Sequence, residues 1–383
     1  MSGKVYCRKK EYMILDSAKR IVIKVGSSLL IDEKTHKIND KWLKSLVEDI
    51  LLLKKDGKEV VIVTSGAVAL GTAYIKSKGR TLKLEEKQAA AACGQTDLIR
   101  NYQKYFNEEK KQTAQILLTI FDSENRRHYL NAKNTIETLL ENDVVPIINE
   151  NDSVATHELR FGDNDRLAAK VAQMTGSDYL ILLSDVDGLY TSNPKLDSSA
   201  IHISQIDEIN EQIEAMATEA LSSSVGSGGM ITKIAAAKIA MKCGCNMILT
   251  KGNQNHPIKS LLSGAKHTLF ISKKNPISAR KQWIASSLTV SGEIVVDSGA
   301  ITALRNGKSL LPAGVIDVKG KFERGDAVEI KDCKLQKIGI GITAYSSNDA
   351  RMIMGHKSQE IEHIVGFSGR SDLIHRDDMV LDL

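Results

Sequence analysis

The stretch Ile21-Val22-Ile23-Lys24-Val25-Gly26-Ser27-Ser28 begins with β-branched residues and ends in three small ones. Such a run is typical of a strand buried inside a sheet, and Gly-Ser-Ser permits a turn with exposed backbone N–H groups. Lys24 stands inside the run, where an unpaired charge would be strongly destabilising. We expect its side chain either to leave the carboxyl end of the strand, where ligands bind in open α/β sheets, or to reach solvent beside the strand end.

The composition is that of an ordinary globular protein with room for two or three domains. The chain has 383 residues, of which 42% are hydrophobic and 26% charged. Aromatic residues make up only 4%, which argues against a surface built on base stacking, and the net charge of +5 does not by itself imply nucleic acid. The first residues lack the apolar core of a signal peptide, no stretch is long enough to span a membrane, and the five cysteines are scattered. We therefore predict a cytoplasmic protein with reduced thiols and no membrane partner.

Short apolar runs alternate with amphipathic segments up to about Ser272. Strands are predicted at 21–25, 59–63, 115–119, 144–148, 179–183 and 247–249. Helices are predicted at 41–54, 85–105, 124–140, 167–174 and 231–241. Strands that alternate with helices indicate a mostly parallel sheet with helices on both faces, an αβα sandwich of the α/β class.

The pattern changes from about Val290, where β-branched runs are separated by glycines. Strands at 293–296, 315–318, 327–330 and 337–344, with one helix at 348–354, predict a small C-terminal all-β barrel. The preceding segment is polar and basic and contains Pro276, so it is predicted to be a linker. The expected organisation is an extension (1–18), an α/β domain (19–272), a linker (273–289), the barrel (290–370) and a C-terminal tail (371–383).

Small and polar residues follow the predicted strands in four loops. The loops lie at 26–28, at 64–67, at 149–153 together with 162–165, and at 184–190. Ser65 and Gly66 open a predicted helix, where backbone amides and the helix dipole make an anion site, although simple N-capping by Ser65 is the alternative. The acids and amides of the third loop are denser than a turn needs.

A glycine-rich loop runs into a helix at 225–233 and brings Lys233 into the first turns of that helix. Its amides can cradle phosphates and its lysine can reach them, although a flexible linker is the alternative. The order of residues is neither that of a P-loop nor that of the dinucleotide fingerprint. Two lysines from separate loops with a carboxylate between them suit phosphoryl transfer, and the remaining acids suit magnesium. The residues alone therefore favour a nucleotide-dependent kinase of a small molecule.

Taken in order, the motifs resemble the glutamate 5-kinases, a family within the amino acid kinase superfamily. The matching segments are IVIKVGSSLL (21–30), VIVTSGAVALG (61–71), AACGQTDLI (91–99), VVPIINENDSVAT (144–156), FGDNDRLAA (161–169), LLSDVDGLYT (182–191) and SVGSGGMITKIAAAKIA (224–240). Residues 292–330 resemble a PUA domain, a small β-barrel found in RNA-modifying enzymes. Only about the first 18 residues look like an unmatched extension.

The resemblance implies a reaction in which ATP and L-glutamate give ADP and L-glutamyl 5-phosphate, the first step of proline biosynthesis, with Mg²⁺ as a cofactor. By motif, Lys24 binds the ATP phosphates, Lys233 stabilises the transferring group, and Asp165 organises the two lysines. The implied glutamate-binding residues are Ser65, Asp152 and Asn164. The implied ATP-binding residues are Lys24, Ser184, Asp185, Ser227, Gly228, Gly229, Met230, Ile231, Thr232 and Lys233.

The resemblance also implies feedback inhibition by proline and assembly into a homo-oligomer, a dimer or a tetramer. Two alternatives are open. One is another amino acid kinase, acting on acetylglutamate, aspartate or a nucleoside monophosphate, from which the paired segments 149–152 and 162–165 distinguish this chain. The other is an RNA-binding protein, but residues 290–370 hold 11 basic and 10 acidic residues, so 11 − 10 = +1. An RNA binder needs a basic patch, so we expect a structural or assembly role for this domain instead.

Overall fold

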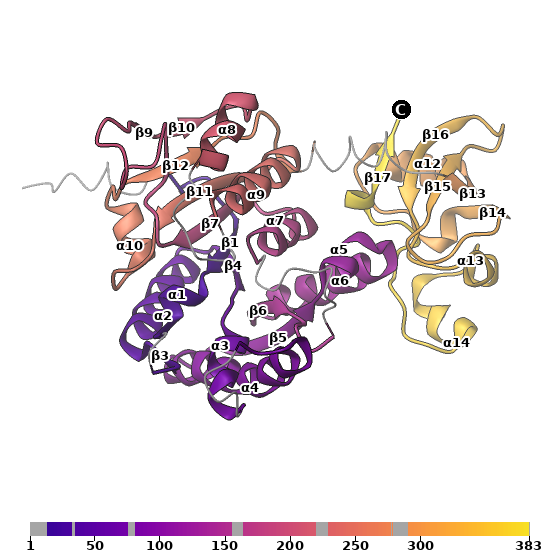
Figure 1. Cartoon of the computed structure of the whole chain (residues 1–383). Coiled ribbons are helices and arrows are strands. Elements are labelled where there is room, and N and C mark those ends of the chain that lie inside the picture. Colours follow the sequence, from indigo (N-terminus) through magenta and orange to yellow (C-terminus); the bar gives the residue numbers. More distant parts are fainter. Residues whose placement is uncertain are drawn as a thin grey trace, which may run out of the picture. The chain divides into compact units, whose positions relative to one another are not determined.

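The computed structural model describes residues 14–32, 35–75, 81–154, 164–219, 229–276, 278 and 290–382 (Figure 1). The chain divides into two compact units. The first consists of Met1–Glu124 with Asn131–Pro276, and the second of Asn125–Leu130 with Ile277–Leu383.

The first unit is organised around an eight-stranded sheet, which confirms the predicted mostly parallel sheet. In spatial order its strands are β10 (Gln205–Ile206), β12 (His267–Phe270), β11 (Asn246–Lys251), β7 (Tyr179–Ser184), β1 (Arg20–Val25), β4 (Glu59–Val63), β6 (Val145–Glu150) and β5 (Thr113–Leu118). Only β11 and β12 pair antiparallel among these neighbours. The predicted strands agree with the structure to within two residues at either end, whereas the short strands β10 and β12 were not predicted.

Helices cover both faces of this sheet. They are α1 (Ser27–Leu30), α2 (Asp40–Lys55), α3 (Ala67–Gly71), α4 (Leu84–Glu108), α5 (Ile120–Glu124), α6 (Arg126–Glu141), α7 (Asn164–Thr175), α8 (Glu211–Glu219), α9 (Met230–Lys242) and α10 (Pro257–Leu262). The apolar faces of α2, α4 and α10 share one core with Ile21 and Ile23 of β1. Because side chains alternate along a strand, Val22 and Lys24 face the other side, where α7 packs on β1 and α9 packs on α7. Figure 1 shows α2 and α7 on opposite sides of the strands β1, β4 and β7.

The helix predicted at 124–140 corresponds to α6, and α5 is a separate short helix before it that was not predicted. Asn125 lies between them, and its side-chain oxygen accepts a hydrogen bond from the backbone N–H of His128 at 3.1 Å. An asparagine in this position caps the start of a helix, so α6 begins at Arg126, two residues after the predicted start.

The second unit contains a five-stranded sheet in the order β14 (Val315–Gly320), β13 (Val290–Val296), β15 (Ala327–Lys331), β16 (Lys337–Ile342) and β17 (Met379–Leu381). The prediction that this region is built on strands is confirmed. The helix predicted at 348–354 is α13 (Ser347–Ile353), whereas α12 (Ser298–Arg305) and α14 (Ile361–Val365) were not predicted. Asp297 starts α12 directly after β13 by accepting a hydrogen bond from Ala300 N at 2.6 Å. Residues 379–381, placed in the predicted tail, form the edge strand β17, which pairs with β16.

In the described ranges, no helix combines the length and the apolar character needed to cross a membrane. Cys93, Cys243, Cys245 and Cys333 are free, in agreement with the predicted thiols, and Cys7 lies outside the described residues.

Candidate active site

The carboxyl ends of β7, β1, β4 and β6 lie side by side, because these four strands are parallel neighbours. The residues that follow them are therefore brought to one edge of the sheet. Gly26 follows β1, Thr64 follows β4, Asn151 follows β6 and Asp185 follows β7. The neighbours β1 and β7 lead on in opposite directions, β1 to β4 and β7 toward β11, and such a switch point is where open α/β sheets bind ligands.

Lys24, near the end of β1, is directed into the layer of α7 rather than into solvent. Its side chain is on the same face of the strand as Val22, and the residue is only 9% exposed. Its Nζ lies 2.6 Å from Oδ1 of Asp165 in the first turn of α7. The expectation that Lys24 reaches solvent is therefore wrong. Its ammonium group instead forms a buried ion pair with Asp165.

Asp165 joins the two predicted lysines. Its Oδ2 accepts hydrogen bonds from Thr232 Oγ1 at 3.0 Å and from Lys233 Nζ at 3.3 Å. Burial raises the pKa of Asp165, but the charges of Lys24 and Lys233 outweigh burial and lower the pKa to about 2. The carboxylate is therefore ionised at neutral pH, and its place in the first turn of a helix favours that charge further.

The close packing of α7 on α9 allows these groups to meet. Both helices are rich in small residues. Their buried alanines are Ala168, Ala169, Ala172, Ala236, Ala237 and Ala240. Lys233 projects from the first turns of α9 and is 6% exposed. Two ammonium groups and one carboxylate leave the cluster with a net charge of +1, which suits the oxygens of a phosphoryl group.

Ser65 and Asn164, two of the predicted glutamate-binding residues, are in contact. Asn164 Nδ2 donates to Ser65 Oγ at 2.7 Å and to the backbone carbonyl of Thr64 at 2.6 Å. Ser65 does not cap the next helix, since Gly66 is the N-cap of α3 and no side chain caps it. Gly66 has φ +111°, and a Cβ there would lie 2.3 Å from Ile31 Cδ1, so only glycine fits this turn. The N-capping alternative for Ser65 is thereby excluded.

Asp152, the third of these residues, lies in the turn after β6. Burial raises its pKa to about 6. No hydrogen bond or ion pair to it is found within the part of the chain that the structure describes. A half-buried carboxylate of this kind gains most from a cation that arrives with a ligand.

The predicted ATP-binding residues flank the cluster from β7 and α9. Ser184 Oγ donates to Asp185 Oδ1 at 3.0 Å, and Asp185 is exposed. Gly229 is the N-cap of α9, and Met230, Ile231, Thr232 and Lys233 form its first turns. Ser227 and Gly228 lie outside the described residues, as do positions 162 and 163 of the third loop.

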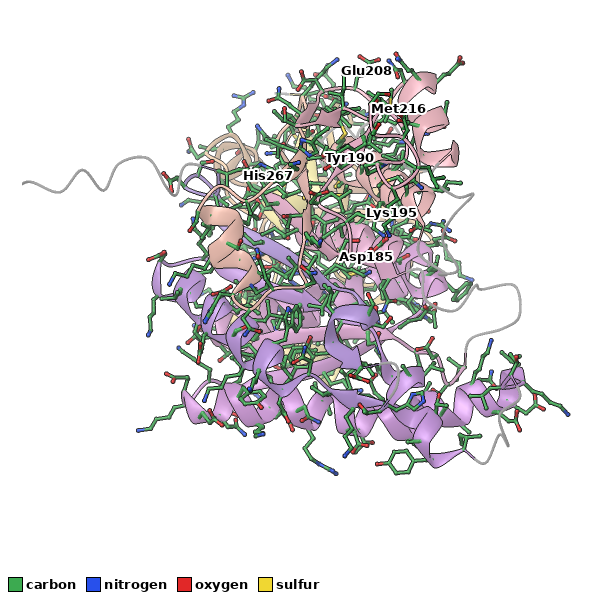
Figure 2. All side chains as sticks on the ribbon, turned by 60° about the vertical axis from the view of Figure 1, so that its left-hand side comes forward. Asp185, Tyr190, Lys195, Glu208, Met216 and His267 are labelled. Atoms are coloured by element: carbon green, nitrogen blue, oxygen red, sulfur yellow. The ribbon has the colours of Figure 1, made fainter. Side chains whose placement is uncertain are left out.

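Figure 2 places Asp185 on the same side of the first unit as Tyr190 and Lys195, which follow it in the chain. The ring of Tyr190 meets the edge of His202 at a centroid distance of 5.2 Å, and Lys266 Nζ lies 5.7 Å from the centre of the Tyr190 ring. Aromatic and cationic groups thus lie beyond the carboxyl end of β7.

The described residues are compatible with a magnesium ion that is bound together with phosphate groups. Among the described residues, no three histidine, cysteine, aspartate or glutamate side chains gather in a metal-binding group. Asp165 is engaged by two lysines, whereas Asp185, which follows β7, is exposed. Magnesium commonly keeps several waters and takes one or two carboxylates besides the substrate phosphates.

Two polar residues that the sequence interpretation left without a role belong to this site. Asn149 Nδ2 donates to Gln95 Oε1 at 2.7 Å, and Asn149 Oδ1 accepts from Asn164 Nδ2 at 3.0 Å. Gln95 stands in a helix rich in small residues, within a segment that carried the family resemblance. A glutamine in that setting was the available signal.

The sequence pattern of the amino acid kinase family matches residues 19–251. That range holds every residue of the cluster around Asp165. The chain belongs to the amino acid kinase family. A PUA domain pattern matches residues 292–365, beyond the amino acid kinase region.

This amino acid kinase is similar over almost its whole length to curated relatives. It is 51% identical to the "Glutamate 5-kinase" of Paramagnetospirillum magneticum over 96% of this chain and 99% of the relative. It is likewise 51% identical to the "Glutamate 5-kinase" of Agrobacterium fabrum, over 96% of this chain and 94% of the relative. Among solved structures, carbamate kinase from Giardia lamblia bound to AMP-PNP is similar at 17% identity and a TM-score of 0.47, covering 67% of this chain and all of that one.

Proposed function

We propose that this chain transfers the γ-phosphoryl group of ATP to the side-chain carboxylate of L-glutamate. The product is L-glutamyl 5-phosphate, the first intermediate of proline biosynthesis, and the compartment is the cytoplasm. The observation that carries the proposal is the buried cluster in which Asp165 holds Lys24 and Lys233 together. Relatives named glutamate 5-kinase, about half identical over nearly the full length, support the choice of substrate.

The nucleophile in this reaction needs no general base. A glutamate side chain is ionised at neutral pH, since its ordinary pKa is about 4.3. One of its oxygens attacks the γ-phosphorus in line, a bond from that oxygen to phosphorus forms, and the bond to the β–γ bridging oxygen breaks as ADP leaves. What the protein must supply is position and positive charge.

The positive charge comes from the two lysines. In a loose transition state the charge spreads over the equatorial oxygens of the transferring group. Lys24 approaches from β1 and Lys233 from α9, with Asp165 between them. Because the carboxylate fixes both ammonium groups before ATP arrives, little reorganisation is needed during the reaction. A bound Mg²⁺ adds further neutralisation of the β- and γ-phosphates.

The amino acid is held by groups at the ends of β4 and β6. Asp152 offers a carboxylate without a partner among the described residues, which suits the substrate ammonium group. Ser65 Oγ and the neighbouring backbone amides suit a substrate carboxylate. Asn164 connects the proposed amino-acid site with the lysine cluster, since it contacts Ser65 and directly precedes Asp165 in α7.

The remaining parts of the proposal follow the family resemblance. We place the kinase domain at 19–272, the linker at 273–289 and the PUA-like domain at 290–370, after an N-terminal extension at 1–18. The PUA-like domain has a net charge of only +1, which supports a structural or assembly role over RNA binding. Proline as feedback inhibitor and a dimeric or tetrameric homo-oligomer complete the proposal.

Substrate choice tests the proposed function directly. We expect L-glutamate to support ATP turnover and N-acetyl-L-glutamate to give none, because the acetyl group removes the ammonium charge that Asp152 is proposed to bind. The measurement is a coupled assay of ADP release with both acids, and with aspartate and UMP as further acceptors. Equal turnover of both glutamates, or turnover of UMP alone, would overturn the assignment.

The pH dependence of glutamate use tests the role of Asp152. Burial raises its pKa to about 6, and only the ionised form pairs with an ammonium group. We therefore expect kcat/KM for glutamate to fall about tenfold per pH unit below about pH 6. Asp152→Asn is expected to remove this limb while raising KM for glutamate much more than KM for ATP.

Asp152→Asn, which is expected to weaken glutamate binding, is expected to stabilise the fold. A carboxyl group whose pKa is raised by folding costs stability above its folded pKa of about 6, and the cost vanishes as the pH falls below its unfolded value of about 4. Asp152→Asn should therefore raise the Tm of the ligand-free enzyme at pH 7.5 but not at pH 4. A lower Tm at pH 7.5 would show that Asp152 is satisfied by the protein itself.

A further inference from the structure

Three buried side-chain amides form a continuous chain that starts at a backbone carbonyl and ends in α4. Asn164 Nδ2 donates to the carbonyl oxygen of Thr64 at 2.6 Å and to Asn149 Oδ1 at 3.0 Å. Asn149 Nδ2 donates in turn to Gln95 Oε1 at 2.7 Å. Gln95, Asn149 and Asn164 are 9%, 1% and 3% exposed, so water competes little for these bonds.

The direction of every amide in this chain follows from its first member. A backbone carbonyl only accepts hydrogen bonds, so the nitrogen of Asn164 must face Thr64. The oxygen of Asn149 must then face Asn164, and its nitrogen must face Gln95. If Gln95 turned its own nitrogen toward Asn149, two donors would meet in a buried place. Gln95 therefore holds the far end of the chain in the one orientation that satisfies it.

The backbone that carries Gln95 is fixed relative to the loop after β4. A Cβ at Gly94 would lie 1.9 Å from the carbonyl oxygen of Ala67, and a Cβ at Gly71 would lie 1.7 Å from that of Ala90. Helices α3 and α4 thus touch backbone to backbone. Since α3 starts directly after Ser65 and Gly66, the side chain of Gln95 stands at a fixed place beside this loop.

The three hydrogen-bonded amides leave one strong acceptor unused. Asn164 Oδ1 is buried and has no hydrogen-bond partner among the described residues. The nitrogen of the same amide has two hydrogens and three acceptors in reach, the third being Ser65 Oγ at 2.7 Å. Asn164 Oδ1 therefore lacks a hydrogen-bond donor, and an N–H group of a ligand would supply one. The ammonium group of an amino acid is such a donor.

We propose that Gln95, acting through Asn149, is a positioning residue that holds Oδ1 of Asn164 toward the ammonium group of the amino-acid substrate. The inference rests on the proposed function, because it takes a free amino acid as the phosphoryl acceptor. Gln95 touches neither substrate. Its effect is on how strongly the enzyme prefers an acceptor with an amine over the same dicarboxylic acid without one.

The test compares L-glutamate with glutarate, which keeps both carboxylates and lacks the amine. Full-length wild type, Gln95→Met and Gln95→Glu are assayed with each acid at saturating ATP. Methionine keeps the length of the side chain and loses the acceptor, whereas the carboxylate of Gln95→Glu still accepts from Asn149. Gln103→Met is the matched control, because Gln103 is exposed on the same helix.

We expect Gln95→Met to lower kcat/KM for glutamate about tenfold, the effect of losing one buried hydrogen bond, and to leave kcat/KM for glutarate and KM for ATP within twofold. Gln95→Glu should recover part of the preference for glutamate, and Gln103→Met should behave as wild type. An equal loss with both acids, with or without a fall in Tm, would show a structural role only and overturn the inference, as would an unchanged preference. If wild type itself fails to phosphorylate glutamate, the proposed function fails instead.

Discussion

Replacing Lys233 by alanine is expected to lower kcat by ~10²–10³, the usual cost of losing one preorganised donor to a developing charge. The ammonium group of Lys233 is held 3.3 Å from Asp165 Oδ2 in a buried place. In a loose transition state charge shifts toward the breaking β–γ bond, so a fixed cation beside the phosphates matters more there than in bound ATP, and the loss should fall on kcat more than on KM. Lys24→Ala, on the other side of the same carboxylate, should give a loss of similar size.

The measurement is steady-state kinetics with both substrates, together with thermal melts to establish that each variant folds. Lys238→Ala is the matched control, since Lys238 lies on the same helix, is exposed and pairs with Glu214 at the surface. Lys233→Arg should not restore the rate, because a planar guanidinium does not replace a compact ammonium at this distance. A folded Lys233→Ala enzyme with nearly normal kcat would remove Lys233 from the mechanism.

Replacing Asp165 by asparagine is expected to reduce kcat by about 10² and to destabilise the fold by about 3–5 kcal/mol. The substitution keeps the shape of the side chain and leaves Lys24 and Lys233 buried without a counter-charge, which is the costly way to break such a cluster. The two ammonium groups should then repel each other and move apart, so neither meets the phosphoryl oxygens correctly.

Coupling between the residues gives the sharper test of this second prediction. If Asp165 acts by holding Lys233, the double variant Asp165→Asn/Lys233→Ala should lose little more activity than the worse single variant. A double-mutant cycle in kcat/KM measures this directly. Simple additivity of the two losses would mean that the carboxylate acts on the reaction independently of the lysine.

The sequence predicted the sheet of the first unit well because its strands are continuous runs of β-branched and aliphatic residues. The strand-end argument also predicted that Lys24 and Lys233 point into one crevice with a carboxylate between them, and the family resemblance named Asp165 as that carboxylate. What the sequence left open was the choice for Lys24 between a crevice and solvent. That choice depends on which face of β1 is covered by α7, and only the packed structure shows this.

The parts that were not predicted depend on contacts between distant segments. The partner of Asn149 is Gln95, 54 residues away, and the two meet because α3 and α4 cross in direct backbone contact at Gly71 and Gly94. No local sequence pattern predicts that two helices cross in this way. The helices α12 and α14 of the second unit are short, with eight and five residues, so their periodicity is too brief to separate from the surrounding strands.

The ion pairs of Asp165 have a consequence for the order of events when the chain folds. Lys24 and Asp165 are 165 − 24 = 141 positions apart, and Asp165 and Lys233 are 68 positions apart. Contacts between such distant segments form late and slow the folding of parallel sheets. A growing chain on the ribosome holds no complete cluster until α9, which ends at Lys242, has emerged. In refolding experiments, enzyme activity should therefore return with the slowest phase of the first unit and not with its early helices.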